Sequence, residues 1–331
     1  MTATVIAATT PVERLGKTRD AVRMLVYGAN TNNMWHDSFT SLPQFLRPDD
    51  VLVFNNSRTI PARLRLQGGG EVRLSRHVSE QVWDVLIMED ESAAVGKMLT
   101  FVGSLTATLL GEGSERPLKQ LKFHASALEV VDYLYKYGEV IRYEYVKEPW
   151  PLADYQTVYG TMPGSVEMAS AGRAFTWRLL ASLRAHGVSF ATITLHAGLS
   201  YYEDDKWPQP SLHPESYTVT KKNAAIMNKA KEAGGRIIAV GTTVVRTLET
   251  VAHRGRVCAG AGETTLHVQR PEQFTVIDGL LTGFHEREAS HMQLLEAFIG
   301  DRGVRAVYDE AIAHNYHWHE FGDMNLLLKD R

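Results

Sequence analysis

Cysteine is nearly absent from this sequence, and long apolar runs are missing altogether. Cys258 is the only cysteine among 331 residues, which excludes an intramolecular disulfide and favours a reducing compartment. No apolar run approaches the ~20 residues of a membrane span. Residues 1–16 lack the basic start and strongly apolar stretch of a signal peptide. We therefore expect a cytoplasmic protein that makes no contact with a membrane.

An excess of positive charge and the common cofactor motifs are also missing. The formal net charge is −3, whereas proteins dedicated to nucleic-acid binding usually carry a basic excess. A local basic patch would still be compatible with an RNA substrate. The sequence contains no G-x-G-x-x-G, G-x-x-x-x-G-K-[ST], G-x-S-x-G or H-E-x-x-H motif. These absences argue against a Rossmann methyltransferase or dehydrogenase and against a P-loop NTPase.

The first third of the chain has the pattern of short strands. Residues 22–28 (VRMLVYG) and 51–54 (VLVF) are apolar runs bounded by turn residues, which predicts buried strands. From about 63 to 124, short apolar or alternating segments are separated by turn clusters such as Glu89-Asp90-Glu91. This pattern of short strands and turns is typical of a small β-barrel.

The rest of the chain alternates helical and strand patterns. Residues 126–137 have helical spacing, with Gly138 as a stop and one predicted apolar face made of Leu128, Val131, Leu134 and Tyr135. After Pro151 we expect a helix at 175–186, a strand at 188–195, a helix at 221–233, a strand at 236–240 and a helix at 242–253.

This alternation predicts a mixed α/β fold with an inserted β domain. Residues 1–62 and 150–331 would form one discontinuous α/β catalytic domain. Residues 63–149 would form the inserted, β-barrel-like domain.

The segment GGRIIAVGTTVVRTLE (234–249) has the pattern of a ligand-binding turn between a strand and a helix. Gly241 allows a sharp turn after a buried strand. We expect Thr242 to cap the helix, leaving a hydroxyl and free amides for a carboxylate or a sugar hydroxyl. Arg246 follows one turn later, on the same face as Thr242 and Thr243. Taken alone, the pattern also fits an ordinary capped strand–helix unit.

His196 follows the predicted strand at 188–195 and opens a glycine-containing turn. Ligands of α/β proteins usually bind at the carboxyl ends of such strands. An imidazole there suits acid–base chemistry. A structural histidine bonded to a neighbouring loop is the open alternative.

The C-terminal region contains two further groups of histidines. His285 and His291 are six residues apart and need not face one another. His314, His317 and His319 have the spacing H-x-x-H-x-H, which corresponds to no common metal-binding pattern, and no cysteine assists them. We therefore expect surface or strand-alternating side chains and predict no metal site.

Collinear blocks along nearly the whole chain resemble one family, the S-adenosylmethionine:tRNA ribosyltransferase-isomerases of queuosine biosynthesis. That family's fold, an α/β domain with a β-barrel inserted near the N-terminus, is similar to the one predicted here. The blocks are TRDAVRMLV (18–26), FLRPDDVLVFNNSRTIPARL (45–64), YQTVYG (155–160), AGRAFTWRLL (171–180), ITLHAGL (193–199), HPESY (213–217), GGRIIAVGTTVVRTLE (234–249), FTVIDGLLTGFH (274–285) and FGDMNLLL (321–328).

The resemblance implies an unusual use of S-adenosylmethionine (SAM). The methyl group does not move. The ribosyl part goes to the aminomethyl group of a 7-deazaguanine base in a tRNA anticodon and is rebuilt as an epoxycyclopentanediol. Adenine and methionine leave, and no metal or cofactor beyond the substrate SAM is required.

Such a reaction needs a base for the C5′ proton, which the sulfonium acidifies, and an acid that helps adenine leave. We assign the acid–base role to His196, with Glu215, His285 and Asp323 as further catalytic candidates. Polar groups must also hold the ribose hydroxyls and the methionine carboxylate, as an arginine fork does well. The residues expected to bind SAM are Asn55, Arg58, Gly172, Phe175, Thr176, Gly198, Gly241, Thr242, Thr243, Arg246, Thr282 and Phe284.

Several segments depart from the family pattern: 54–58, which loses a carboxylate, 198–202, 169–174 and 283–290. Ala174 stands where the family has a histidine, and Arg173 adds a charge. Glu286 and Glu288 are new, and they would repel phosphate if they faced an RNA. Two alternatives therefore stay open: a paralogue that cleaves SAM or uses a small-molecule acceptor without tRNA, and a SAM-binding protein without catalysis. The oligomeric state, monomer or homodimer, is also open.

Overall fold

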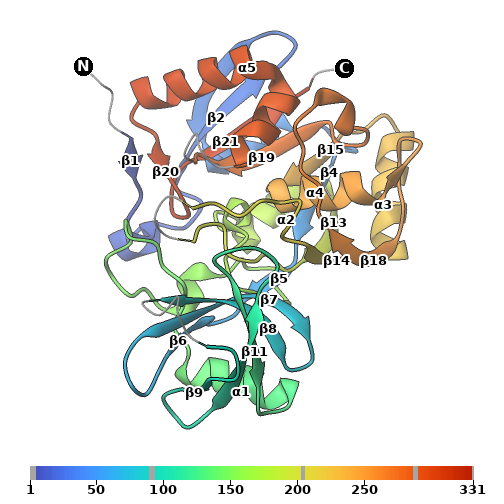
Figure 1. Cartoon of the computed structure of the whole chain (residues 1–331). Coiled ribbons are helices and arrows are strands. Elements are labelled where there is room, and N and C mark those ends of the chain that lie inside the picture. The colour runs from blue at the N-terminus through green and yellow to red at the C-terminus, as the bar shows by residue number, and fades with distance from the viewer. Residues whose placement is uncertain (1–4, 89–93, 203–205, 286–289, 330–331) are drawn as a thin grey trace.

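Two β-sheets of different size organise the chain, one of nine strands and one of six (Figure 1). The structure is a computed structural model, and it describes residues 5–88, 94–202, 206–285 and 290–329. The predicted turn at 89–91 and the two new glutamates, Glu286 and Glu288, lie outside the described residues.

The large sheet has a parallel centre, and the pairs outside it are antiparallel except for β21 with β2. Its four central strands, β13, β4, β15 and β19, run parallel to one another. In spatial order the strands are β18 (Gly260–Thr264), β14 (Glu215–Val219), β13 (Ser189–Leu195), β4 (Val51–Asn55), β15 (Ile237–Val240), β19 (Gly279–Gly283), β21 (Met324–Leu328), β2 (Arg23–Gly28) and β3 (Asn33–Ser38).

The central strands are buried on both faces, as their continuous apolar sequences predict. Every residue of β4 and β15 is buried. The strands predicted near 22–28, 51–54, 188–195 and 236–240 are confirmed.

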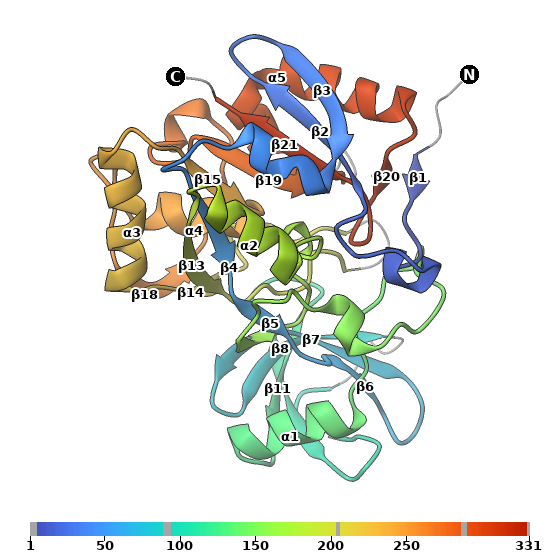
Figure 2. The same cartoon turned by 180° about the vertical axis from the view of Figure 1, so that it is seen from behind.

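Helices cover both faces of the large sheet, so that the domain has three layers. Helices α3, α4 and α5 lie on the face seen in Figure 1, and α2 lies on the opposite face, seen in Figure 2. The alternation of β4 shows the same division: Val51 and Val53 pack in the core that contains Met227 of α3, whereas Leu52 and Phe54 pack in the core that contains Leu183 of α2. These helices are α2 (Trp177–Ala185), α3 (Lys221–Glu232), α4 (Thr242–Val251) and α5 (Ser290–Ala313), and the 3-10 helix η2 (Phe39–Phe45) joins α2 on its face.

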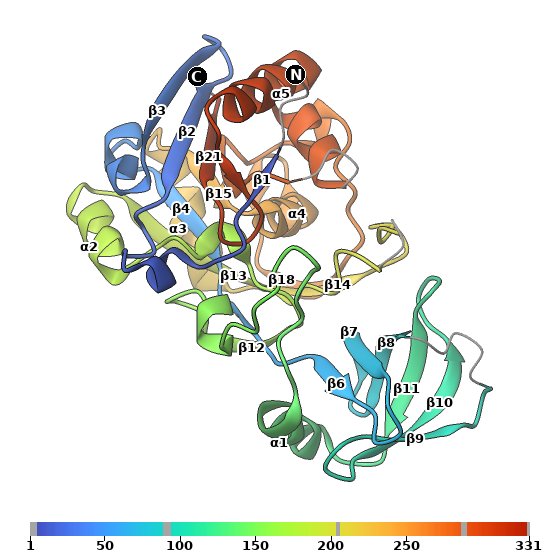
Figure 3. The same cartoon turned by 90° about the vertical axis from the view of Figure 1, so that its left-hand side faces the viewer.

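The six-stranded antiparallel sheet curls upon itself and is set apart from the large sheet (Figure 3). Backbone hydrogen bonds from Gln67 to Thr100 (2.9 Å) and from Val102 to Arg65 (3.0 Å) join its two margins. The predicted β-barrel-like domain is therefore confirmed as a curled antiparallel sheet. Its exact boundaries stay predictions. In spatial order the strands are β6 (Arg63–Arg65), β7 (Glu71–Ser79), β8 (Val82–Met88), β11 (Lys119–Phe123), β10 (Thr106–Glu112) and β9 (Met98–Thr100).

Helix α1 (Ala127–Tyr137) packs on the small sheet with a face that overlaps the predicted one only in part. Val130, Tyr133 and Leu134 are buried in the core of this sheet, whereas Leu128 is 70% exposed and Tyr135 is 44% exposed. The prediction is confirmed for Leu134 and wrong for Leu128 and Tyr135. Apolar residues recur at helical spacing on both sides of this helix, and the periodicity alone does not choose between them.

Short elements complete the chain, and the hairpin after α4 corrects the predicted end of that helix. Helix α4 ends at Val251, two residues before the predicted end, because residues 252 and 253 begin a hairpin. Within the described ranges, no helix has the length and apolar character needed to cross a membrane. The short strands are β1 (Ile6–Ala7), β5 (Ser57–Thr59), β12 (Met162–Ser165), β16 (Ala252–His253), β17 (Arg256–Val257) and β20 (His317–Trp318), and the further 3-10 helices are η1 (Val12–Leu15), η3 (Leu152–Tyr155), η4 (Ser170–Gly172) and η5 (Pro271–Gln273).

Candidate active site at the carboxyl edge of the large sheet

A pocket of about 470 Å³ lies where three parallel strands of the large sheet end. Residues that follow β13, β15 and β19 line it, as does Glu215 at the start of β14. Carboxyl ends of parallel strands are the usual position of ligand sites in open α/β sheets, because the loops there diverge and leave a crevice. We call this cavity the main pocket.

The turn between β15 and α4 forms one wall of the main pocket, as the sequence predicted. Gly241 has a φ of 93°, which favours glycine, and Thr242 and Thr243 line the pocket after it. The expected cap was wrong: Gly241 is the N-cap residue, no side chain caps the helix, and Thr242 is already its first residue. The first amides of a helix have no partner within the helix, so this end can accept an anionic or hydroxyl-bearing ligand.

Arg246 and Glu215 form an ion pair in the wall next to this helix end. The Nε of Arg246 donates to the carbonyl of Leu266 (3.0 Å), and Nη1 donates to Glu215. Glu215 also accepts from the backbone amide of Gly198 (3.2 Å). The remaining nitrogen, Nη2, is buried and has no partner among the described residues. Because a buried donor without a partner is costly, this atom is a strong candidate for a bond to a ligand.

Two histidines that sequence reasoning left apart come together in the main pocket. The rings of His285 and His291 have centroids 4.2 Å apart. Nε2 of His291 lies 3.4 Å from the hydroxyl of Thr282. Burial lowers the pKa of His291 to about 4. Burial, together with His291 and His319, lowers the pKa of His285 well below its usual value. Both imidazoles are therefore neutral at physiological pH, a state in which they can accept a proton or a hydrogen bond.

A carboxylic acid that no sequence motif indicated lies in another wall. Glu167 accepts from the hydroxyl of Tyr143 and from the backbone amide of Ser200 (2.8 Å). Burial raises the pKa of Glu167 to about 7, although the bonds from Tyr143 and Ser200 act in the opposite direction. A carboxyl group that titrates near neutral pH in a pocket is a candidate for general acid–base catalysis.

Aromatic rings also line the main pocket. The rings of Tyr145 and His319 stack with centroids 4.1 Å apart, and those of Tyr201 and Trp207 lie 5.0 Å apart. A planar heterocycle can stack on such surfaces.

Part of the predicted site lies in the main pocket. The structure brings together there residues from β19 and from the loops and helix that follow β13 and β15. The predicted residues that line the pocket are Gly198, Glu215, Gly241, Thr242, Thr243, Arg246, Thr282 and His285.

His196, the first candidate for acid–base catalysis, faces elsewhere. It lines a separate hollow of about 260 Å³ beside the small sheet, and its Nδ1 lies 2.8 Å from the hydroxyl of Ser57. Side chains alternate along the extended chain, and Ile193 and Leu195 are buried in the core beneath α3 and α4, so His196 takes the opposite side. The geometry therefore does not support a proton transfer by His196 in the main pocket.

Asp323 lies in a structural ion pair outside the pocket wall. It accepts from the backbone amides of Arg23 and His317, both at 2.8 Å, and from the guanidinium of Arg23. These bonds tie the turn before β21 to β2. They give Asp323 a structural role.

The other predicted residues outside the pocket wall also have structural contacts. The Asn55 amide donates to the carbonyl of Leu195, and the Arg58 guanidinium to that of Gly160. Thr176 caps α2. Phe175 and Phe284 are core residues.

Gly172 lies against Tyr159, and a Cβ built at this position would lie 1.8 Å from the Tyr159 hydroxyl. Any larger residue here would force the Tyr159 side chain to shift, so packing favours glycine at this position.

Of the residues at 169–174, where the sequence departs from the family pattern, some line the main pocket and others lie outside it. Ala169, Ser170 and Ala171 line the main pocket, whereas Ala174 is buried in the core and Arg173 pairs with Glu13. The added positive charge of Arg173 is therefore compensated away from the pocket.

The fold and the site define an α/β protein with an inserted antiparallel sheet and a pocket suited to a ligand that is part anion and part heterocycle. The chain belongs to the family described as queuosine biosynthesis protein, which it matches over residues 2–327.

Curated relatives and a solved structure agree with this assignment. The S-adenosylmethionine:tRNA ribosyltransferase-isomerase of Carboxydothermus hydrogenoformans is 36% identical over 98% of this chain and 96% of its own length. That of Thermus thermophilus is 38% identical over 94% of this chain and 93% of its own length. The crystal structure of the S-adenosylmethionine tRNA ribosyltransferase of Thermotoga maritima matches with a TM-score of 0.56 and 30% identity, covering 98% of this chain and 96% of that one.

Proposed function

We propose that this protein is a cytoplasmic S-adenosylmethionine:tRNA ribosyltransferase-isomerase. It would transfer the ribosyl part of SAM to the aminomethyl nitrogen of a 7-deazaguanine base in tRNA, with release of adenine and methionine. Family membership and the names of the relatives support the activity. The observation that carries its assignment to the main pocket is Arg246, whose buried Nη2 is unpaired beside the start of α4.

Arg246 and the start of α4 are suited to the charged end of SAM. The methionine carboxylate can accept from Arg246 Nη2, which has no partner among the described residues, and from the amides at the start of α4, which no side chain caps. The hydroxyls of Thr242 and Thr243 lie at the same helix end and can bond the ribose. Glu215 holds the guanidinium in place.

Glu167 and the histidine pair are suited to opposite proton transfers. Adenine leaves more readily when it receives a proton, and Glu167, with a pKa of about 7, can hold that proton near neutral pH. The C5′ proton next to the sulfonium must be removed, and the neutral imidazoles of His285 and His291 can accept it. The stacked rings of Tyr145 and His319 offer a surface for the adenine. No further cofactor is invoked in this scheme.

One chromatographic assay tests the proposal. The protein is incubated with SAM, with and without tRNA that carries the 7-aminomethyl base, and adenine and methionine are quantified. We expect both products only in the mixture with that tRNA. Release without tRNA would indicate a small-molecule or hydrolytic reaction, and SAM binding without any product would indicate a binding protein; either result would contradict the proposal.

A further inference from the structure

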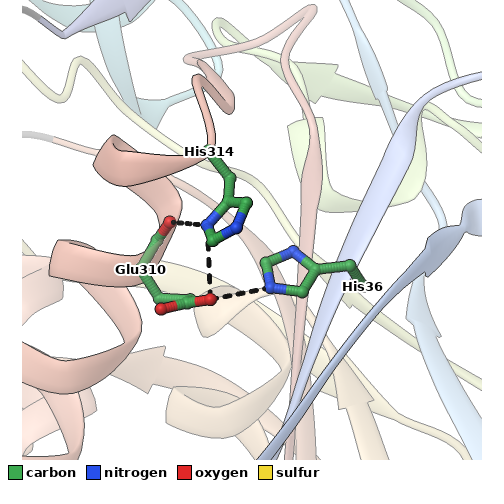
Figure 4. A group of neighbouring side chains, drawn as sticks. All are labelled: His36, Glu310 and His314. Atoms are coloured by element: carbon green, nitrogen blue, oxygen red, sulfur yellow. Dashed lines mark hydrogen bonds and ion pairs between the residues drawn. The ribbon is translucent and has the colours of Figure 1, made fainter.

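Three side chains with metal-binding atoms meet on the surface of the α/β domain, outside the wall of the main pocket (Figure 4). His36 comes from β3, at the margin of the large sheet. Glu310 lies in the last turn of α5, and His314 follows the end of that helix. One ligand atom from each lies within 4.8 Å of the others.

The distances within this group are close to those that a bound metal ion requires. Nε2 of His36 lies 2.9 Å from Oε1 of Glu310, and Nδ1 of His314 lies 3.2 Å from the same oxygen. Around a tetrahedral zinc ion with bonds of about 2.0–2.1 Å, neighbouring ligand atoms are separated by roughly 3.3 Å. Small movements of these side chains would therefore place the three ligand atoms around a bound ion.

The ring of His36 is already oriented as a metal-binding histidine is. Its Nδ1 lies 3.0 Å from the hydroxyl of Tyr316, which leaves Nε2 facing the carboxylate of Glu310. Metal-binding histidines usually have such a partner on the second nitrogen, because it fixes the ring and the tautomer. His314 Nδ1 now lies 3.0 Å from the carbonyl of Glu310, and this hydrogen bond is the one that a metal bond would replace.

The local charge also suits a cation. The carbonyl end of a helix carries partial negative charge, and Glu310 adds a full one. A neighbouring opposing charge is that of Arg23, which donates to the carbonyls of His314 and Asn315. Asp323 pairs with Arg23 at 3.1 Å and compensates that charge.

We propose that His36, Glu310 and His314 form a binding site for a zinc-like divalent cation. Two imidazoles and one carboxylate suit a borderline ion such as Zn²⁺ or Co²⁺, with water as the fourth ligand, whereas Mg²⁺ prefers oxygen ligands alone. The bound ion links the marginal strand β3 to the end of α5. The site belongs neither to the main pocket nor to the reaction proposed for it.

Titration of the full chain with Co²⁺ or Zn²⁺, after treatment with a chelator, tests the site. We expect one equivalent to bind, and we expect bound Co²⁺ to show the visible absorption of a four-coordinate ion. His36→Ala and Glu310→Gln should each weaken binding by at least about tenfold. His314→Ala is a third, independent variant should either of these fold poorly, which circular dichroism will show.

Matched controls separate this site from other groups that bind metal ions. His253→Ala and Cys258→Ser change an exposed histidine and the exposed cysteine, and they should bind as the unchanged protein does. His285→Ala changes the histidine pair of the main pocket and should also leave the affinity unchanged. The proposal is overturned if the unchanged protein binds no ion, if the folded His36, Glu310 and His314 variants retain full affinity, or if only His285→Ala abolishes binding.

Discussion

Replacing Arg246 with lysine perturbs the proposed carboxylate contact with the least disturbance of the fold. Lysine retains the positive charge that pairs with Glu215 but lacks the planar fork. Its single ammonium cannot bond Leu266, Glu215 and a ligand in the directions that the three guanidinium nitrogens take. Alanine is less informative, because it would leave Glu215, which is 7% exposed, without its partner.

The expected effect follows from the loss of one hydrogen bond to a charged group. Such a bond contributes about 1.5–3 kcal/mol, which corresponds to a roughly 10- to 150-fold rise in the KM for SAM. Steady-state adenine release at saturating tRNA measures this KM, and thermal unfolding monitors the fold. Arg256→Lys is the matched control, because Arg256 is exposed and pairs with Glu232 outside the main pocket. A KM within about twofold of the unchanged protein for the Arg246 variant would refute the carboxylate assignment.

Two further substitutions separate chemistry from structure. If Glu167 donates the proton to adenine, turnover requires its protonated form, so kcat should fall as the pH rises through about 7. Glu167→Gln should lower kcat by roughly 10²–10⁴-fold and remove this fall of kcat with rising pH. If the fall persists in the variant, another group causes it. Asp323→Asn should lower the free energy of unfolding by about 1–3 kcal/mol in urea titrations, because the bonds to Arg23 and His317 are weakened, and should leave the KM for SAM unchanged. A lowered kcat with unchanged stability would instead support the catalytic role predicted for Asp323 from the sequence.

The parallel centre of the fold could be predicted because its sequence signals are local. β4 and β15 are continuous apolar runs, and such runs belong to strands covered on both faces. The orientation of α1 could not be predicted in the same way. Tyr133 rather than Leu128 is buried there, which depends on the shape of the small sheet beneath the helix.

The walls of the candidate site could be predicted where one segment contributes several residues. Gly241, Thr242, Thr243 and Arg246 lie within one turn and the start of one helix, so their proximity follows from the chain itself. Glu167 lies in a loop without a motif, and only the folded chain brings it to Tyr143 and Ser200.

The side on which His196 lies could also have been predicted from the sequence. The signal was present in the sequence, because alternation along β13 from the buried Ile193 and Leu195 places His196 on the other side. The imidazole lines the separate hollow beside the small sheet, and its acid–base role stays a prediction.

Isotope transfer tests the central claim most directly. SAM labelled with ¹³C in its ribosyl carbons and SAM labelled in its methyl group are each incubated with the protein and with tRNA bearing the 7-aminomethyl base. The tRNA nucleosides are then analysed by mass spectrometry. Our account predicts that all the ribosyl carbons enter the modified nucleoside and that the methyl label does not. Transfer of the methyl label, or the absence of label from the tRNA in both mixtures, would contradict it.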